Sequence, residues 1–111
     1  MIMDKEKFYI RLEDRLIEEI GYIDKENSIA YSDDDSLIWH NEKWTATDIE
    51  TGCKITTGHT LEECKNNVMK IMDKIVDRRN SNAGRIYRKQ FEQILNGGLG
   101  NGVIRIEQEY I

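Results

Sequence analysis

Two cysteines and two histidines are the side chains of this 111-residue chain that could bind a soft metal ion. Two thiolates and two imidazoles together make up a common structural zinc site. Neither the pair Cys53 and Cys64 nor the pair His40 and His59 has the CxxC or HxxxH spacing of a compact finger. Cys64 also falls on a predicted apolar helical stripe, where a thiol packs as a small hydrophobic group. We interpret it as a core residue and predict no metal or cofactor.

A cysteine and a histidine can also form a nucleophile and its general base. Cys53 and His59 are close in sequence, but no third group that would orient the base is evident. With two histidines in the whole chain, no complete set of nucleophile, base and orienting group can be assembled. We therefore predict a protein that is not an enzyme.

Clustered carboxylates and clustered glycines are two further patterns with known chemistry. The run Asp33–Asp35 could bind calcium, but it lacks the mid-loop glycine and late glutamate of an EF-hand, so we interpret it as a solvated turn. The glycine-rich run at 97–102 follows a predicted helix and precedes a predicted strand. Phosphate-binding loops have the opposite order, so we interpret this run as a connector.

A basic tract lies in the last third of the chain, and its residues from 78 to 89 could contact phosphates. Those residues are Arg78, Arg79, Arg85, Arg88 and Lys89. Acidic residues at 73, 77 and 92 are interleaved with the tract, a pattern typical of a salt-bridged helix surface. Direct nucleic-acid binding is one alternative. An acidic patch of a partner protein, or the acidic half of a second copy in a homodimer, would fit equally well.

Charge is unevenly distributed along the chain, which has a net charge of −5. Residues 1–36 carry 11 acidic and 5 basic side chains, whereas residues 70–111 carry 5 acidic and 8 basic ones. Such asymmetry determines what a surface attracts. The length predicts a single domain spanning residues 1–111. No apolar run approaches the roughly 20 residues that span a bilayer, and no signal peptide is evident, so we predict a cytoplasmic protein with free thiols.

Hydrophobic periodicity predicts an α+β fold that begins with a helix. Phe8, Leu12, Leu16 and Ile20 recur every four residues, which favours a helix over Asp4–Ile20 that ends at Gly21. A short strand is the alternative at its start, because apolar residues alternate at positions 8, 10 and 12.

Short apolar runs then predict a four-stranded antiparallel meander. Its strands are expected at Asn27–Ser32, Leu37–His40, Trp44–Ile49 and Cys53–Thr57. A covering helix follows, because Thr60 and Glu63 form a capping box and the helix runs to Arg79. A further helix over Arg85–Leu95 and a C-terminal strand over Val103–Tyr110 complete the predicted fold.

The run from Thr57 to Val68, which reads TGHTLEECKNNV and is entered from a hairpin, resembles HicB-type antitoxins. In that family a strand ends in a similar turn that opens the covering helix. The resemblance spans Trp44 to about Ile75 and implies strand–strand–helix packing, with no functional residue carried over. The family normally opens with a strand and often carries a separate DNA-binding part, and neither is clear in this chain.

The chain also resembles, in general type only, small acidic inhibitors encoded by phages and mobile elements, including anti-CRISPR proteins. This leads to the hypothesis of a protein-binding inhibitor whose acidic face blocks a nucleic-acid-handling partner such as an effector nuclease. The residues expected on that face are Asp33, Asp34, Asp35, Glu18, Glu19, Glu26, Glu42 and the aromatic Trp39. The alternative is an antitoxin-like module that neutralises a toxin and contacts DNA through residues 78–89.

Overall fold

The chain begins with a long β-hairpin. The computed structural model describes residues 3–11, 15–33, 43–97 and 102–104. Strand β1 (Asp4–Arg11) pairs antiparallel with β2 (Arg15–Asp24) along its whole length. The predicted helix over Asp4–Ile20 is therefore wrong, and the fold opens with two strands in its place.

Burial in β2 follows a strand period. Leu16 and Glu18 are buried while Ile17 and Glu19 between them are partly exposed. After Glu19 the buried face changes, since Ile20 is 36% exposed while Gly21 and Ile23 are buried. A spacing of four residues is also two strand repeats, so apolar residues four apart fit either structure over a short segment. The aromatic and β-branched residues of this segment favour the strand.

Five strands form an antiparallel meander in the order β1-β2-β3-β4-β5. The last three are β3 (Ile29–Asp33), β4 (Trp44–Asp48) and β5 (Lys54–Gly58). The predicted hairpin that starts at Trp44 is confirmed, but the four-stranded sheet is wrong because β1 and β2 belong to the same sheet. The strand predicted at Leu37–His40 lies outside the described residues.

A short sixth strand, β6 (Gly102–Ile104), joins the sheet beside β2. It pairs in parallel with Arg15–Ile17, whereas β3 pairs with Tyr22–Asp24 of the same strand. The predicted C-terminal strand over Val103–Tyr110 does not match this arrangement. β6 covers three residues, and residues 105–111 lie outside the described part of the chain.

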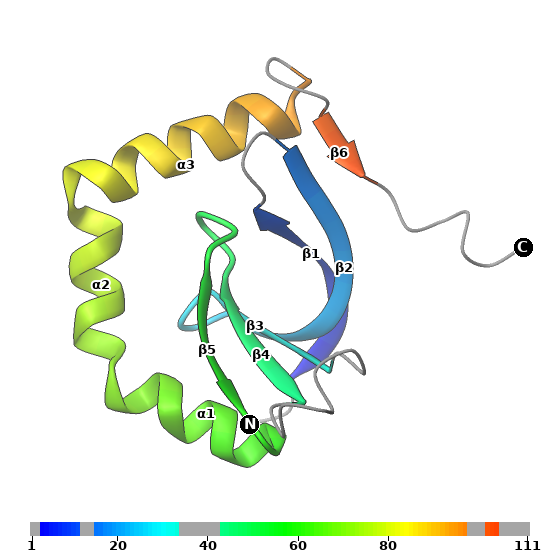
Figure 1. Cartoon of the computed structure of the whole chain (residues 1–111), viewed down its shortest axis with the longest axis vertical. Coiled ribbons are helices and arrows are strands. Elements are labelled where there is room, and N and C mark those ends of the chain that lie inside the picture. Colours follow the sequence, from blue (N-terminus) through cyan, green and yellow to red (C-terminus); the bar gives the residue numbers. More distant parts are fainter. Residues whose placement is uncertain (1–2, 12–14, 34–42, 98–101, 105–111) are drawn as a thin grey trace, which may run out of the picture.

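Strand β2 curves along its length (Figure 1), and Gly21 lies in its second half. A β-carbon at this position would lie 2.6 Å from the carbonyl oxygen of Tyr31 and 2.9 Å from the ring of Phe8. Both contacts are closer than a side chain tolerates, so the close packing of β2 on β3 requires a glycine. The sequence pattern assigned this glycine to the end of a helix, which is wrong.

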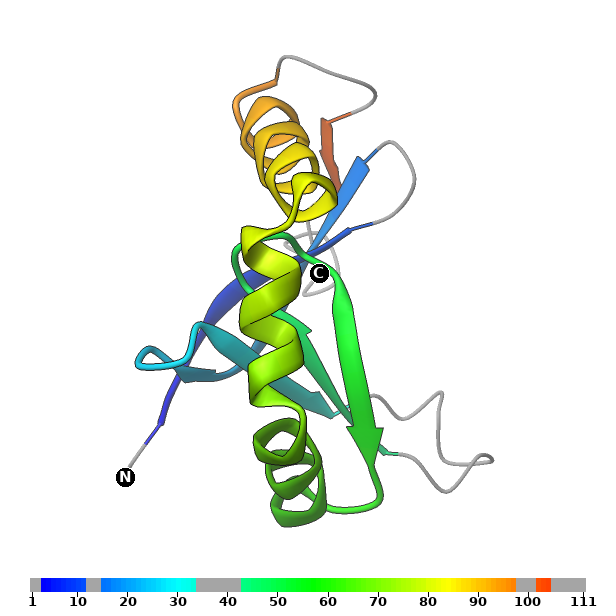
Figure 2. The same ribbon diagram turned by 90° about the vertical axis from the view of Figure 1, so that its left-hand side faces the viewer.

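Three helices follow the meander and form an arc along one side of the sheet (Figure 1). They are α1 (Leu61–Lys70), α2 (Met72–Asn80) and α3 (Asn82–Leu95). Turned by 90°, the molecule shows the three helices one above the other (Figure 2). None of the helices in the described ranges is long and apolar enough to cross a membrane.

The predicted N-cap of α1 is confirmed. The hydroxyl of Thr60 accepts a hydrogen bond from the backbone N–H of Glu63 at 3.1 Å, which satisfies one donor that a helix start otherwise leaves free. The carboxylate of Glu63 accepts a hydrogen bond from the N–H of His59, the residue before the N-cap, also at 3.1 Å, whereas a capping box would use the N–H of Thr60.

The single covering helix predicted from Thr60 to Arg79 is wrong, because it breaks at Ile71 into α1 and α2. Ile71 has φ −119° and ψ 17°, and its N–H donates to the carbonyl of Val68 at 3.1 Å, a tighter turn than that of an α-helix. The break changes the direction of the chain so that Val68 on α1 and Ile75 on α2 both reach the core.

The corner between α2 and α3 is tighter than the break predicted at 80–84. Ser81 caps α3 by accepting a hydrogen bond from the N–H of Gly84 at 3.1 Å, so α3 begins at Asn82 and not at Arg85. A β-carbon on Gly84 would collide with the carbonyl of Arg78.

The buried side chains form three clusters, and two of them hold the helices to the sheet. The main cluster joins the meander to α1 and α2 through Ile29, Tyr31, Ala46, Cys64, Val68 and Ile75. A second cluster of Phe8, Ile23 and Ala30 lies within the sheet, and a third of Leu16, Phe91 and Ile94 joins β2 to α3. The predicted role of Cys64 as a core residue is confirmed, since its exposed fraction is 0%.

Candidate functional site

The structure separates Glu18 and Glu19, two members of the predicted acidic face. Glu18 is buried on β2, and its carboxylate lies 3.0 Å from the ammonium of Lys7. Glu19 is partly exposed and, as the next residue of the strand, points to the opposite face of the sheet. These two glutamates do not contribute to one surface.

Two other acidic residues of that set are exposed. Asp33 ends β3, where its carboxylate lies 3.5 Å from the ammonium of Lys43. Glu26 lies in the turn between β2 and β3. The remaining predicted members lie outside the described residues, namely Asp34, Asp35, Trp39 and Glu42.

The basic tract is divided between buried and exposed positions. Arg79 is 9% exposed, and Arg88 is paired with Glu50 at 2.8 Å. Arg78, Arg85 and Lys89 are exposed on α2 and α3. The tract therefore does not form one continuous contact surface.

The guanidinium of Arg79 ties the end of α2 to two turns of the sheet. Its Nε donates to both carboxylate oxygens of Asp48 at 3.2 Å. Its Nη2 donates to the carbonyls of Asn27 at 2.8 Å and Ser28 at 3.1 Å. Asp48 also accepts from the N–H of Glu50 at 3.0 Å. This buried charge pair is extensively hydrogen-bonded, and its arrangement is structural.

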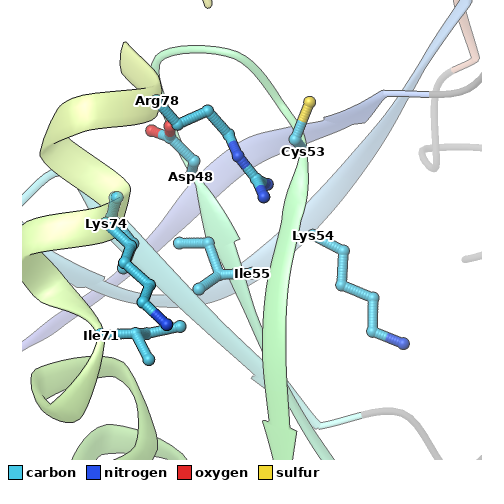
Figure 3. Close-up of a pocket in the computed structure, with 8 residues that line it drawn as sticks. Asp48, Cys53, Lys54, Ile55, Ile71, Lys74 and Arg78 are labelled. Atoms are coloured by element: carbon cyan, nitrogen blue, oxygen red, sulfur yellow. The ribbon is translucent and has the colours of Figure 1, made fainter. Parts of the chain in front are cut away.

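A small groove of about 100 Å³ lies between β5 and α2 (Figure 3). Ile55, Ile71 and Ile75 provide its apolar lining. Figure 3 shows Lys74 and Arg78 reaching from α2 towards β5, whereas the side chain of Lys54, also at the groove, points away. Two cations beside an apolar floor suit an anionic group that is attached to an aliphatic one.

A larger cavity of about 210 Å³ lies between the β2–β3 turn and α1. Asp24, Glu26 and Glu62 place three carboxylates around it, and Lys65 contributes one ammonium. The other lining residues are Met3, Asn27, Tyr31, Asn66 and Met69. Because acidic groups outnumber basic ones, this cavity favours a cationic ligand.

Cys64 and Tyr31 are the buried groups whose proton affinity the fold changes most clearly. Burial, assisted by the nearby carboxylate of Glu63, raises the pKa of the Cys64 thiol to about 11. Burial and then the carboxylate of Asp24 raise the pKa of the Tyr31 phenol. Both groups are therefore neutral at physiological pH, so Cys64 does not provide a thiolate nucleophile.

Neither cysteine forms a disulfide. No group of three or more His, Cys, Asp or Glu side chains is arranged to hold a metal ion among the residues that the structure describes. His40, the upstream histidine of the set considered for zinc, lies outside those residues.

The sequence analysis predicted neither the groove at β5 nor the acidic cavity. Asp24 and Glu62 are separated by 38 positions, and nothing in the local pattern indicates that they line one cavity.

Comparisons with known proteins were made for the whole chain. No protein-family model, no curated protein and no solved structure matches it.

Proposed function

We propose that this chain is a non-catalytic protein-binding inhibitor that blocks a nucleic-acid-handling partner by presenting carboxylates to its basic surface. The observation that supports the proposal is the gathering of Asp24, Glu26 and Glu62 around one cavity. These carboxylates come from a turn and a helix that are distant in sequence. A nucleic-acid-binding cleft is lined by lysine and arginine, so carboxylates held on a rigid fold compete with phosphates for it.

The residues that carry the proposal differ in part from those the sequence suggested. Glu26 belongs both to the acidic face that the sequence predicted and to the residues around the cavity. Glu62 on α1 lines the cavity but was not part of the predicted face. Asp4 and Glu6 on neighbouring β1 are exposed, but Asp4 pairs with Ile23 and so lies on the opposite face of the sheet from Asp24; both acids stay outside this set. An inhibitor of this type is what phages and other mobile elements use against host defences, in the manner of anti-CRISPR proteins.

The experiment has two stages. The tagged protein is first used to capture its partner from host cytosol, and the partner is identified. Displacement of labelled DNA or RNA from that partner is then followed by fluorescence anisotropy at increasing salt. We expect the displacement of nucleic acid to weaken as the salt concentration rises. We also expect the double substitution Glu26→Lys and Glu62→Lys to reduce it.

The matched control is the pair Asp73→Lys and Asp77→Lys on exposed positions of α2. It changes the net charge equally but leaves the cavity unaltered, so displacement should persist. A partner that keeps its nucleic acid when the inhibitor binds would refute the proposal. Equal losses in both double variants would also refute it, because they would show an effect of net charge alone.

The second candidate function is an antitoxin-like module that also contacts DNA. It is favoured by the position of Lys74 and Arg78 beside the groove at β5 (Figure 3). A gel-shift assay tests it, with Lys74→Gln and Arg78→Gln set against Arg85→Gln and Lys89→Gln on α3. Retardation that the first pair abolishes and the second pair leaves intact would support this function, and no retardation by the unmodified protein would exclude it.

A further inference from the structure

The hydroxyl of Tyr31 is a buried polar group that the protein leaves unsatisfied. Tyr31 is 1% exposed, and its hydroxyl has no hydrogen-bond partner among the residues that the structure describes. A buried hydroxyl without a partner costs on the order of 1–3 kcal/mol, and most such groups in proteins are satisfied. An unsatisfied one that borders a cavity therefore points to a bound group that completes it.

Tyr31 shares the acidic cavity with Asp24. It borders two cavities, one with Asp24 and Glu62 and the other with Tyr22 and Trp44, and Asp24 lines the first cavity only. Burial raises the pKa of the Tyr31 phenol, and the carboxylate of Asp24 raises it further, which agrees with a hydroxyl beside the first cavity.

The carboxylate of Asp24 is held in a fixed orientation. Its Oδ2 accepts a hydrogen bond from the side-chain amide of Asn27 at 2.8 Å, and its Oδ1 accepts one from the backbone N–H of the same residue at 3.3 Å. Each oxygen keeps a further lone pair. A ligand with several N–H donors can therefore use Asp24 and Tyr31 together without disturbing the turn.

The chemistry of the walls selects the class of ligand. The three carboxylates oppose an anion. The volume of about 210 Å³ exceeds the roughly 10–15 Å³ that holds one water molecule. Met3 and Met69 add flexible apolar side chains, which pack well against an aliphatic stem.

We propose that the Tyr31 pocket, formed by Tyr31, Asp24, Glu26, Glu62, Met3 and Met69, binds a primary ammonium group carried on an aliphatic stem. Two of the ammonium's three N–H groups donate to the hydroxyl of Tyr31 and the carboxylate of Asp24. The third donates to a glutamate at the rim, and the methylene groups pack between the methionines. A lysine side chain of a partner and a free alkyl diamine share this chemistry.

Lys65 provides an internal check on the proposal. Its ammonium is part of the lining, so it opposes a second cation in the same cavity. Removing that charge with Lys65→Gln should tighten amine binding. An apolar pocket that bound alkyl chains without regard to charge would not respond in this way.

The test measures binding of three probes to the full chain by isothermal titration calorimetry. The probes are pentylamine, the diamine cadaverine and a lysine blocked at both termini. Tyr31→Phe should weaken each probe by about tenfold, the equivalent of roughly 1.4 kcal/mol, because it removes one acceptor from a charged donor. Tyr22→Phe, on the neighbouring strand and outside the pocket, is the matched control and should bind as the unmodified protein does.

Glu62→Gln extends the test to an exposed position on α1, where the substitution does not disturb the core. It should weaken the amines as well, whereas tetramethylammonium, which has no N–H donor, should bind no differently to Tyr31→Phe. Preference for blocked lysine over cadaverine would identify a protein side chain as the source of the ammonium group, and the reverse preference would identify a free amine. Failure of all three probes to bind would overturn the proposal, as would equal binding by Tyr31→Phe.

The biological role of the pocket rests on the proposed inhibitory function, but the two can fail separately. Amine binding without displacement of nucleic acid from a captured partner would support the amine-binding pocket and refute the inhibitory function. Displacement that persists in Tyr31→Phe and Glu62→Gln, together with no amine binding, would support the inhibitory function and refute the pocket.

Discussion

Arg79 and Tyr31 are both buried polar side chains packed against the same meander, yet their surroundings differ. The guanidinium of Arg79 is bonded to Asp48 and to two backbone carbonyls of the β2–β3 turn. The hydroxyl of Tyr31 has no partner and borders a cavity. One group holds α2 to the sheet, and the other contributes nothing comparable to the fold.

This difference separates a structural polar site from a candidate binding site. A fully hydrogen-bonded buried network makes the native arrangement rigid, whereas an unsatisfied group stores a cost that a ligand removes. Arg79, one of the arginines that the sequence suggested for binding DNA, belongs to such a structural network. Tyr31, which borders a cavity with three carboxylates, is the better candidate for recognition.

The largest expected effect is a loss of stability on replacing Arg79, the structural group of the two. Arg79→Ala leaves the carboxylate of Asp48 buried without its partner, which should reduce the free energy of unfolding by about 3–5 kcal/mol. Urea denaturation followed by circular dichroism measures this loss. Arg85→Ala, on the exposed side of α3, is the control and should change stability by no more than about 0.5 kcal/mol. Similar small changes in both variants would show that the buried pair does not hold the fold.

The second prediction uses the buried ionisable groups around the Tyr31 pocket. The pKa of Cys64 rises from 9.0 to about 11 on folding, and that of Tyr31 also rises. The stability from keeping the Cys64 thiol neutral is complete below pH 9 and is lost as the pH approaches 11. We expect Cys64 to account for a decrease of roughly 1–3 kcal/mol over this window.

Denaturation at a series of alkaline pH values measures this decrease. Cys64→Val should flatten it, since valine has no ionisable proton, whereas Cys53→Val should leave it unchanged. A pH dependence that is identical in both variants would contradict the assignment to Cys64.

The smallest expected effect belongs to Tyr31 itself. Tyr31→Phe removes a hydroxyl that has no partner among the described residues, so the free energy of unfolding should rise by about 1 kcal/mol. Denaturation in urea checks this value beside that of Arg79→Ala. A loss as large as that of the arginine variant would mean that the hydroxyl is bonded in the folded protein.

Local signals in the sequence predicted local structure well. The N-cap at Thr60 and the hairpin from Trp44 depend on residues within a few positions of each other, and both are confirmed. The N-terminal segment was assigned wrongly because apolar residues four apart satisfy a helix and a strand equally. Its pairing with the adjacent segment, and the close contact of Gly21 with Tyr31, decide the structure.

The sites depend on contacts between distant segments. Asp48 and Arg79 are 31 residues apart, so their pairing could not be read from either motif. The break at Ile71 lacks proline or glycine, the residues that usually mark one in a sequence, and it determines where α2 places Arg78 and Arg79. The cavity at Tyr31 exists only once α1 has packed on the β2–β3 turn.

Titration of the labelled protein with blocked lysine, followed by the amide signals in two-dimensional NMR spectra, tests the binding site at Tyr31 most directly. We expect saturable shifts of the amide signals of Asn27, Glu62 and Asn66 around the cavity, and no shift at Ile71 and Lys74 beside the groove. The shifts around the cavity should be absent in Tyr31→Phe. Shifts confined to the groove, or the same shifts in Tyr31→Phe, would contradict it.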